Sequence, residues 1–462
     1  MPKWYTFLMK KNNFGEGNIT LIILKQAVPL IIAQLAQLLY NIVDRVFIGH
    51  IPETGKNSLT GLGICFPLIS LIMAFTLLFG LGGTPLFSIS KGEGKNEKAT
   101  DIMRHSFVLL LFSSFIITIV SYLTMKPLIY GLGASDTTFF YAKEYLKIYL
   151  LGTPFLMIGS GMNFYISAQG RPGTAMITTL SGAVVNVVLD PLLIYYMGLG
   201  IRGAAIATVI SQIVSFVWVM FFFVVKGSEI KLSFKGFVFS LKTSLRIVSV
   251  GITNFIMEAT NCIIQLVCNK SLAYYGGDDY VTIMTVINSV RSILGLVVSG
   301  ITSGCQPVLG FNYGAKKYDR VCKAIKVNTI MGILYTLVAW ALVWIFPSFF
   351  IKLFTDDPQI LLFGTKYLKI YFMGYIFMSL QFSGQSTFMA LAKVKYAITF
   401  SILRKIIIVV PLTLILPLLM KDSIAGVFWA EPISNLIGGS ASFITMYITV
   451  YRRLKAKERL AA

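Results

Sequence analysis

Apolar runs long enough to cross a lipid bilayer recur along the whole of this 462-residue chain. Hydrophobic residues make up 56% of the chain and charged residues only 13%, against roughly 25% charged residues in soluble domains. Each run approaches the roughly 20 residues that a helix needs to span the hydrocarbon core. The runs are continuously apolar rather than alternating, which excludes a transmembrane β-barrel. The sequence therefore predicts an all-α polytopic membrane protein.

About twelve spans are expected, joined by short loops. Their predicted bounds are 24–49, 58–84, 102–125, 139–163, 174–196, 203–225, 244–269, 280–305, 325–347, 361–389, 397–420 and 426–450. Basic residues gather in alternate loops, such as Lys231 and Lys235, whereas the other loops carry acids such as Asp278 and Asp279. The positive-inside rule then predicts that both termini are cytoplasmic. Because the net charge of +21 resides in these loops, it does not indicate a nucleic-acid partner.

The two halves of the chain repeat. Tyr145-Leu-Lys-Ile-Tyr149 recurs as Tyr367-Leu-Lys-Ile-Tyr371, an offset of 367 − 145 = 222 residues. The same offset relates Gly82 to Gly304, Pro85 to Pro307 and Asn163 to Gln385, and one residue later Gln212 aligns with Asn435. Six spans per repeat is an even number, so the repeats are expected to be parallel and related by an axis along the membrane normal.

This repeat defines the predicted domains. They are a cytoplasmic tail (1–20), an N-terminal six-helix lobe (21–226), a basic inter-lobe linker (227–242), a C-terminal six-helix lobe (243–451) and a basic cytoplasmic tail (452–462). Parallel repeats in polytopic proteins commonly form two lobes around a central pathway, with binding sites at membrane depth. Transport is therefore the favoured function, and a receptor or scaffold that duplicated for packing is the alternative.

The first span carries a polar stripe. Gln34, Gln37, Asn41 and Asp44 are spaced i, i+3, i+7 and i+10, so a helix places them on one face. Lipid does not tolerate such a face, which must meet protein or a water-filled cavity. An acid at membrane depth is costly and usually functional. The alternative is that Asp44 lies at the helix end among the lipid headgroups.

A second acid is expected near Asp44. Asn186 and Asp190 are spaced i, i+4 on the fifth span and share a face. Together with Asp44 and Asn41 they would form a cluster of two carboxylates and two amides. Two close carboxylates in apolar surroundings do not both ionise readily, so such a pair holds a proton, or a Na⁺ ion if both ionise. The alternatives are an inter-helix hydrogen bond for Asn186 and a capped, kinked helix end for Asp190, which precedes Pro191.

Two further features concern helix bending and the second lobe. Pro29 lies within the first span and permits a bend, so we consider it a hinge that Asp44 could bias, with a static kink as the alternative. The seventh span carries Glu258, Asn261 and Gln265 as another stripe, and Arg291 on the eighth span could pair with Glu258. Such a pair would be structural, and a binding site is the alternative.

Three motifs resemble one known family of transporters. Asn41-Ile-Val-Asp44-Arg-Val-Phe-Ile-Gly49 is similar to the first-helix signature of the multidrug and toxic compound extrusion (MATE) family. Gly300-Ile-Thr-Ser-Gly-Cys-Gln306-Pro307-Val-Leu-Gly310-Phe-Asn312-Tyr313-Gly314-Ala315 resembles the loop after its eighth helix, and Asn186-Val-Val-Leu-Asp190-Pro191 its fifth-helix motif. The resemblance covers essentially the whole chain and is nearest to the multidrug pumps of Gram-positive bacteria.

The resemblance implies a V-shaped, two-lobe exporter in the cytoplasmic membrane. It implies that the chain exports organic cations or drugs in exchange for Na⁺ or H⁺ by alternating access, as a monomer without cofactors or enzymatic activity. The expected ion-coupling residues are Asp44, Asn186 and Asp190, which would also hold any Na⁺. The expected substrate-binding residues are Gln34, Gln37, Tyr40, Asn41, Asn163, Glu258, Asn261, Gln265 and Gln385. Some family members carry an acid on the tenth helix, where this chain has Gln381 and Gln385, so a C-terminal-lobe cation site of that type is not expected.

Three other functions remain as alternatives. A related exporter or flippase of an anionic lipid-linked or metabolite substrate needs a cavity rich in Arg and Lys, and apart from Arg45, Arg291, Arg404 and Lys405 the spans lack such a set. An intramembrane enzyme needs a nucleophile and base or metal ligands at depth, and the two histidines are not placed mid-span. A channel does not require the two-lobe repeat.

Overall fold

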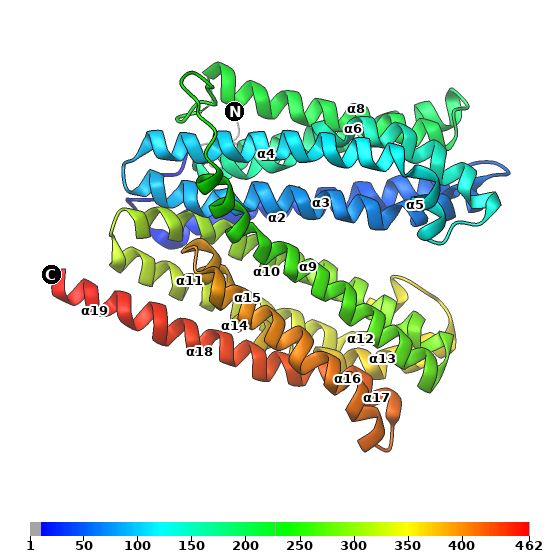
Figure 1. Cartoon of the computed structure of the whole chain (residues 1–462). Helices are drawn as coiled ribbons and strands as arrows, with labels where there is room; N and C mark the ends of the chain where they lie inside the picture. Colours follow the sequence, from blue (N-terminus) through cyan, green and yellow to red (C-terminus); the bar gives the residue numbers. More distant parts are fainter. Residues whose placement is uncertain (1–10, 227, 462) are drawn as a thin grey trace, which may run out of the picture. The chain divides into compact units, whose positions relative to one another are not determined.

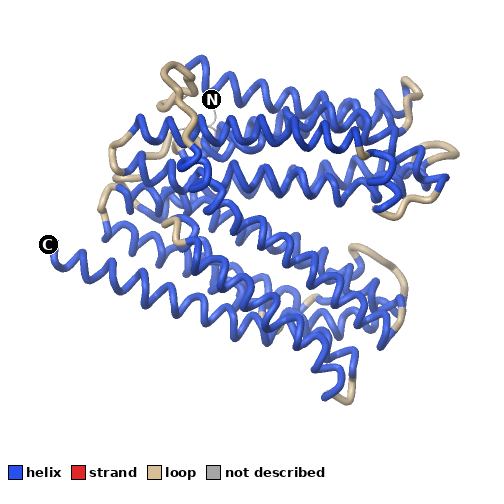
Figure 2. Tube along the Cα trace, viewed as in Figure 1, coloured by secondary structure: helices blue, strands red, loops and turns tan. Residues whose placement is uncertain are grey.

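The described part of the chain is helical throughout. The computed structural model describes residues 11–226 and 228–461, and these residues contain helices and loops but no strand. Figure 2 shows the helices joined by loops. The prediction of an all-α protein is confirmed.

The N-terminal repeat contains six long helices and one short one. They are α2 (Ile19–Gly49), α3 (Gly55–Gly92), α4 (Asn96–Leu123), the short α5 (Met125–Gly131), α6 (Asp136–Ala168), α7 (Pro172–Pro191) and α8 (Ile201–Phe221). Two π-helical segments extend α7 and α8, namely η1 (Leu192–Tyr196) and η2 (Phe222–Lys226). These helices run roughly along one direction in Figure 1.

The C-terminal repeat is built in the same order but is more broken. Its helices are α9 (Leu241–Gly276), α10 (Asp278–Gly314), α11 (Tyr318–Ile345), the short α12 (Pro347–Lys352), α13 (Pro358–Phe372), α14 (Tyr375–Ala390), α15 (Val394–Ile402), α16 (Val410–Leu419), α17 (Ser423–Ser434), α18 (Ser440–Met446) and α19 (Arg452–Ala461). Three π-helical segments join them: η3 (Leu403–Val409), η4 (Asn435–Gly439) and η5 (Tyr447–Tyr451).

The helix boundaries confirm the internal repeat. α2 and α9 begin 222 residues apart, at Ile19 and Leu241. The same offset relates the starts of α4 and α11, and it relates both ends of α6 to the start of α13 and the end of α14. The two repeats therefore have the same helix order and connections, as the sequence predicts.

Ten described helices are long and apolar enough to cross a membrane, and α13 with α14 makes an eleventh if the pair forms one span bent by 45°. α6 has 33 residues and is the counterpart of that bent pair. Counting it gives the twelve spans that the sequence predicts. The tenth predicted span, 361–389, is not continuous, because the chain bends at Gly374, where a side chain would contact the backbone of Pro432 at 2.6 Å.

The chain divides into two compact units. Their boundaries differ from those of the predicted lobes, because the first helix of each repeat is divided between the two units. Among the described residues, one unit holds 11–12 and Ile32–Asn254, and the other holds Asn13–Ile31 and 255–461. The first part of α2 thus belongs to the second unit and the first part of α9 to the first, and glycines allow these helix ends to pack closely. A Cβ at Gly304 would lie 2.8 Å from Ala27 N in the second unit, and one at Gly82 would lie 2.9 Å from Gly251 Cα in the first. The exchange is therefore repeated in both units at related positions.

The predicted tails contain ordered contacts. Residues 1–10 and 462 lie outside the described residues, but Phe14 is buried and its carbonyl accepts hydrogen bonds from Asn312 Nδ2 at 2.9 Å and Arg320 Nη2 at 3.0 Å within the second unit. The C-terminal residues form α19 rather than a loose tail.

Helix α6 is the centre of the first unit. It packs against α3, α4, α7 and α8, and these helices lie side by side in Figure 1. Small residues permit this packing, since a Cβ at Gly80 of α3 would lie 2.8 Å from Gly161 Cα of α6. The packing fixes the inward face of α6, which carries buried Tyr145 and Tyr149 next to α2 and α8.

Candidate functional site

The two acids predicted to meet do meet inside the first unit. Asp44 of α2 is 9% exposed, and Asn186 and Asp190 of α7 are 1% and 0% exposed. The carboxyl groups of Asp44 and Asp190 lie within hydrogen-bonding reach of each other. Asn186 Nδ2 donates to Asp190 Oδ1 at 3.3 Å. The structure therefore brings together the three residues predicted to couple an ion.

Acceptors outnumber donors in this cluster. Asp44 Oδ1, Asp190 Oδ2 and Asn186 Oδ1 are buried and have no hydrogen-bond donor. Buried polar atoms in folded proteins are normally satisfied, and ionised carboxylates can only accept. A proton shared by the two acids, or a cation with a preference for oxygen ligands, satisfies this arrangement. Among the described residues, no group of three or more His, Cys, Asp or Glu side chains could hold a metal ion.

Three tyrosines lie at or next to the acid cluster. Tyr40 lies one helical turn before Asp44, near both acids and beside Gln37. Tyr145 of α6 lies near Asp44, and Tyr149 lies between Tyr40 and Gln212 of α8. Gly152 leaves room for Gln212, whose amide oxygen a Cβ there would strike. Tyr145, Tyr149 and Gln212 were not predicted as site residues. Their only signal in the sequence is the repeated Tyr-Leu-Lys-Ile-Tyr motif and the Gln212–Asn435 alignment.

The position of Asp190 follows from the end of its helix. Pro191 lacks an N–H group, and the chain continues as the π-helical η1. Such widened turns are frequent at functional sites. Tyr195 in η1 donates its hydroxyl hydrogen to the Phe47 carbonyl oxygen at 2.6 Å, which ties α7 to the end of α2. Both helices that carry the acids are thus fixed to each other beyond the cluster.

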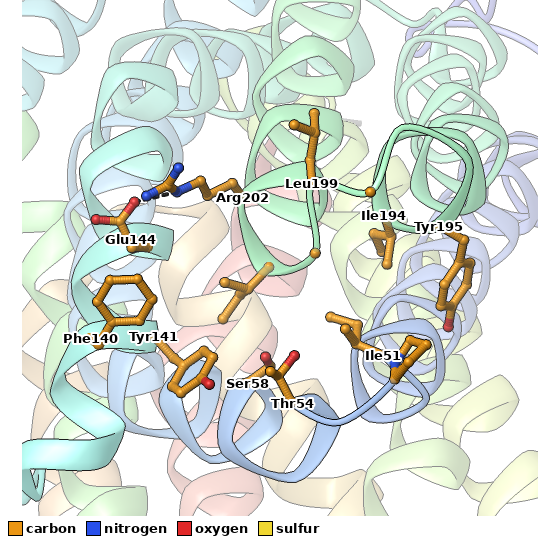
Figure 3. A pocket seen from close by; sticks show the side chains of 14 residues that line it. Ile51, Thr54, Ser58, Phe140, Tyr141, Glu144, Ile194, Tyr195, Leu199 and Arg202 are labelled. Atoms are coloured by element: carbon orange, nitrogen blue, oxygen red, sulfur yellow. Dashed lines mark hydrogen bonds and ion pairs between the residues drawn. The ribbon is translucent and has the colours of Figure 1, made fainter.

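A cavity of about 610 Å³ opens at this end of the first unit (Figure 3). Its walls come from the α2–α3 connection, the first turns of α6, and η1 with the start of α8. Glu144 and Arg202 form an ion pair across it. Neither Asp44 nor Asp190 lines the cavity, but Ile194 and Tyr195 do, and they follow Asp190 by one turn.

The predicted substrate-binding residues lie in different surroundings. Gln34, Gln37 and Tyr40 are half-buried and Asn41 is exposed on α2, while Glu258 and Gln265 are exposed and Asn261 is half-buried on α9. Asn163 Nδ2 donates to the Ala175 carbonyl at 3.0 Å, and Gln385 Nε2 donates to the Ala397 carbonyl at 3.3 Å. These two bonds join equivalent helices at the 222-residue offset. Asn163 and Gln385 therefore hold helices together in both repeats, and their substrate-binding role stays a prediction.

The predicted pairing of Arg291 with Glu258 is wrong. Arg291 of α10 instead pairs with Glu431 of α17 at 3.7 Å, and Arg404 of η3 pairs with Glu431 at 3.0 Å. Glu431 had no evident partner in the sequence, because its two cations lie 140 and 27 residues away along the chain. Only the tertiary packing of the second unit brings the three side chains together.

Two helical repeats with the same helix order, one of which encloses a pair of acids, define a membrane transporter rather than an enzyme. Comparison with known proteins gives the family. The MatE family model matches residues 29–192 and again residues 252–415, one match in each repeat. The chain belongs to the MatE family.

Individual relatives and solved structures agree with this assignment. Multidrug export protein MepA of Staphylococcus haemolyticus is 26% identical over 446 residues, covering 94% of each chain, and MepA of Staphylococcus aureus is 24% identical over 424 residues, covering 91% of this chain and 92% of the relative. These relatives confirm the resemblance to pumps of Gram-positive bacteria. A MATE transporter solved in a bent conformation shares the fold, with a TM-score of 0.90, 21% identity and 99% coverage of both chains. A transporter from Pyrococcus furiosus, described as having a binding pocket of reverse polarity, shares the fold with a TM-score of 0.88 at 20% identity. The match covers 98% of this chain and 99% of that transporter.

Proposed function

We propose that this protein is a secondary active antiporter that exports organic cations or drugs in exchange for Na⁺ or H⁺ by alternating access. The observation that carries the proposal is the buried pair of Asp44 and Asp190, with Asn186 beside them and three oxygen atoms without donors. Acids at membrane depth mark ion pathways. The export of drugs by the MepA relatives supports the nature of the cargo.

The acid pair can couple the two movements through charge. With both carboxylates ionised, the cluster attracts a cationic cargo that reaches the face of α2 carrying Gln34, Gln37 and Asn41. When a proton or Na⁺ binds at Asp44 and Asp190, that attraction is lost. The coupling ion and the cargo therefore weaken each other's binding, and linkage requires the effect to be equal in both directions.

The ion needs a path from water to the acids. The cavity at the end of η1 supports one, because Tyr195 lines it and lies near Asp190. The positive-inside pattern supports an orientation with both termini in the cytoplasm and this end of the unit on the outer side of the cell membrane. We propose that the protein lies in the cytoplasmic membrane in this orientation, as a multi-pass monomer.

An exporter or flippase of an anionic lipid-linked or metabolite substrate is the second candidate. The specific observation in its favour is the group of cations around Glu431 in the second unit. The acid pair of the first unit argues for cationic cargo, because an anion would be repelled there. Export assays with cargo of each charge distinguish the two candidates.

The test is export of a fluorescent organic cation from vesicles that contain the purified protein, under separately imposed Na⁺ and pH gradients. We expect one gradient to drive export and Asp44→Asn to reduce that export to background while leaving membrane insertion intact. The matched control is Asp356→Asn, which removes an exposed acid in the loop before α13.

The control variant should export at the normal rate. Export by Asp44→Asn at the normal rate, or export that needs neither gradient, would contradict the proposal. The relative size of the two gradient effects identifies the coupling ion.

A further inference from the structure

The second unit contains a polar cluster that the proposed cation exchange does not use. Arg404 and Lys405 of η3 are 6% and 4% exposed, and Glu431 of α17 is 6% exposed. Glu431 accepts a hydrogen bond from Arg404 at 3.0 Å and pairs more loosely with Arg291 at 3.7 Å. Lys405 donates to the Met257 carbonyl at 2.7 Å. Three cations thus surround one buried carboxylate.

Donors outnumber acceptors in this cluster, the reverse of the acid pair in the first unit. The Nε atoms of Arg291 and Arg404 and the hydroxyl of Tyr375 are buried and have no hydrogen-bond partner. Tyr371 and Tyr375 of α13 and α14 lie near Arg291. The one further acid within electrostatic reach is Glu258, which is exposed on α9. A buried guanidinium with an unpaired Nε edge suits a planar carboxylate, which takes two parallel hydrogen bonds.

Two residues beside the cluster have counterparts in the region of the acid pair in the first repeat. Tyr371 corresponds to Tyr149 at the 222-residue offset, and Asn435, which accepts a hydrogen bond from Arg404, corresponds to Gln212 one residue later in register. In the first repeat Tyr149 lies beside Gln212 and near Tyr40, and Tyr40 lies near both Asp44 and Asp190. Asp44 and Asp190 themselves correspond to Leu266 and Leu412, so the cations of the second repeat stand on other positions than the acids of the first.

The chain makes room for the cations in a specific way. Arg404 corresponds to Gly182 of α7, which packs against Ser215, whereas Gly438 stands opposite Arg404 and a Cβ there would lie 2.7 Å from Arg404 Cγ. The glycine of this contact therefore lies on opposite helices in the two repeats, and it faces a small serine in the first repeat but the large Arg404 in the second. Arg404 and Lys405 also lie in a π-helical segment that α7 lacks at the corresponding residues 181–187. Widened turns of this kind are frequent at functional sites.

We propose that the cluster around Arg291 and Arg404 binds the carboxylate group of a transported molecule. Arg291, whose side chain is 27% exposed, contacts the ligand, and Arg404, Glu431 and Asn435 position it. The ligand carboxylate takes the place of the loose contact between Arg291 and Glu431. As far as this ligand is cargo, the inference rests on the proposed export function, and it extends the cargo from simple cations to zwitterions that carry both charges.

Direct binding to the purified protein tests this site without relying on transport. The probes are a rhodamine dye with a free carboxylate and the methyl ester of the same dye, which keeps the positive charge and loses the negative one. Fluorescence anisotropy in detergent measures the affinity for each. Because hydrogen bonds to charged groups are stronger than those between neutral groups, we expect Arg291→Gln to weaken binding of the carboxylate dye about tenfold or more and to leave the ester unchanged.

Two further variants keep the test decisive. Arg452→Gln removes an exposed cation of α19 and should change neither affinity. Arg291→Lys keeps the charge but not the two-pronged geometry and should lose part of the affinity for the carboxylate dye. Thermal unfolding checks that each variant is folded.

The proposed site would be overturned if folded Arg291→Gln lost affinity for both dyes equally, or kept its affinity for both. Asp44→Asn should abolish gradient-driven export of both dyes yet retain the selective binding of the carboxylate form. A result with selective binding but no gradient-driven export by the wild type would reject the antiport proposal and leave the carboxylate site standing.

Discussion

Single small residues decide how closely the helices around the acid pair can pack. Gly83 of α3 faces Tyr165 of α6, whose hydroxyl donates to Ser106 Oγ of α4 at 2.6 Å. A Cβ at Gly83 would strike both the Tyr165 hydroxyl and Ser106 Oγ. Since all three side-chain positions are buried, the helices have no room to relax toward solvent. This one glycine of α3 therefore leaves room for a hydrogen bond that joins α4 and α6.

Gly83→Ala should lower stability by ~1–3 kcal/mol, the usual cost of overpacking a well-packed interior. Gly63→Ala is the matched control on the same helix, because a Cβ at exposed Gly63 meets nothing within 4 Å. Alanine there should be neutral or stabilising by a few tenths to about 1 kcal/mol, since glycine is a poor helix former. Thermal unfolding in detergent measures both. Equal melting temperatures for the two variants would show that the Tyr165–Ser106 contact yields without cost.

At the scale of the helix, α2 is one of two helices, with α9, that are divided between the compact units. Residues up to Ile31 belong to the second unit and residues from Ile32 to the first, and Pro29 lies close to this division. Proline inside a helix removes a backbone hydrogen bond and permits a bend. The hinge role of Pro29 stays a prediction, and its position next to the boundary between units is the structural reason to test it.

Pro29→Ala should leave the melting temperature unchanged or raise it, because alanine restores a backbone donor within the helix. Gradient-driven export should fall several-fold if bending of α2 accompanies each cycle. Pro358→Ala is the control, since Pro358 occupies the first turn of α13, where proline is well tolerated. Normal export by Pro29→Ala would leave the bend as a static kink.

At the scale of the whole molecule, the segment that joins the repeats is fastened to the first unit. Gln169 is 1% exposed, and its amide oxygen accepts hydrogen bonds from the Ser228 hydroxyl and the Glu229 N–H, both at 2.9 Å. Its Nε2 donates to the Ile230 carbonyl at 3.1 Å. Glu229 also forms ion pairs with Lys91 at 2.8 Å and Lys11 at 3.0 Å. These hydrogen bonds and ion pairs therefore fix the linker to the first unit.

These ion pairs predict a pH dependence. Partial burial favours a raised pKa for Glu229, but hydrogen bonds and charge from Lys91 and Lys11 outweigh it and leave the pKa below its usual value. The stabilisation is therefore present at neutral pH and is lost as the pH falls through the lowered pKa, below the usual value of about 4.3 for glutamate. Because Glu229 is nearly half-exposed, Glu229→Gln should cost at most about 1 kcal/mol at pH 7.

The measurement is thermal unfolding of the wild type and Glu229→Gln from pH 7 down to about pH 3, below the usual pKa of glutamate. The difference in melting temperature should shrink toward zero at the acidic end. Glu97→Gln, which removes an exposed acid on the first turn of α4, is the control. A difference that stays constant over the whole range would mean that Glu229 acts through shape rather than charge.

The sequence by itself determined the fold class, the repeat and the acid pair. Apolar runs of bilayer length must be helical because lipid offers no partner to backbone polar groups. The repeated Tyr-Leu-Lys-Ile-Tyr motif gave the 222-residue offset that the helix ends reproduce. Asp44 and Asp190 could be predicted to act together, because acids are rare within membrane spans and those found there usually serve function.

Only the tertiary structure decided which distant side chains complete each site. Tyr145, Tyr149 and Gln212 look like ordinary helix residues in the sequence. The packing of α6 and α8 places Tyr145 near Asp44, and Tyr149 near Tyr40 and Gln212. The same holds for Glu431 and its partners Arg291 and Arg404. Periodicity along one helix shows which face a side chain occupies, but the partner across that face depends on packing between helices far apart in the chain.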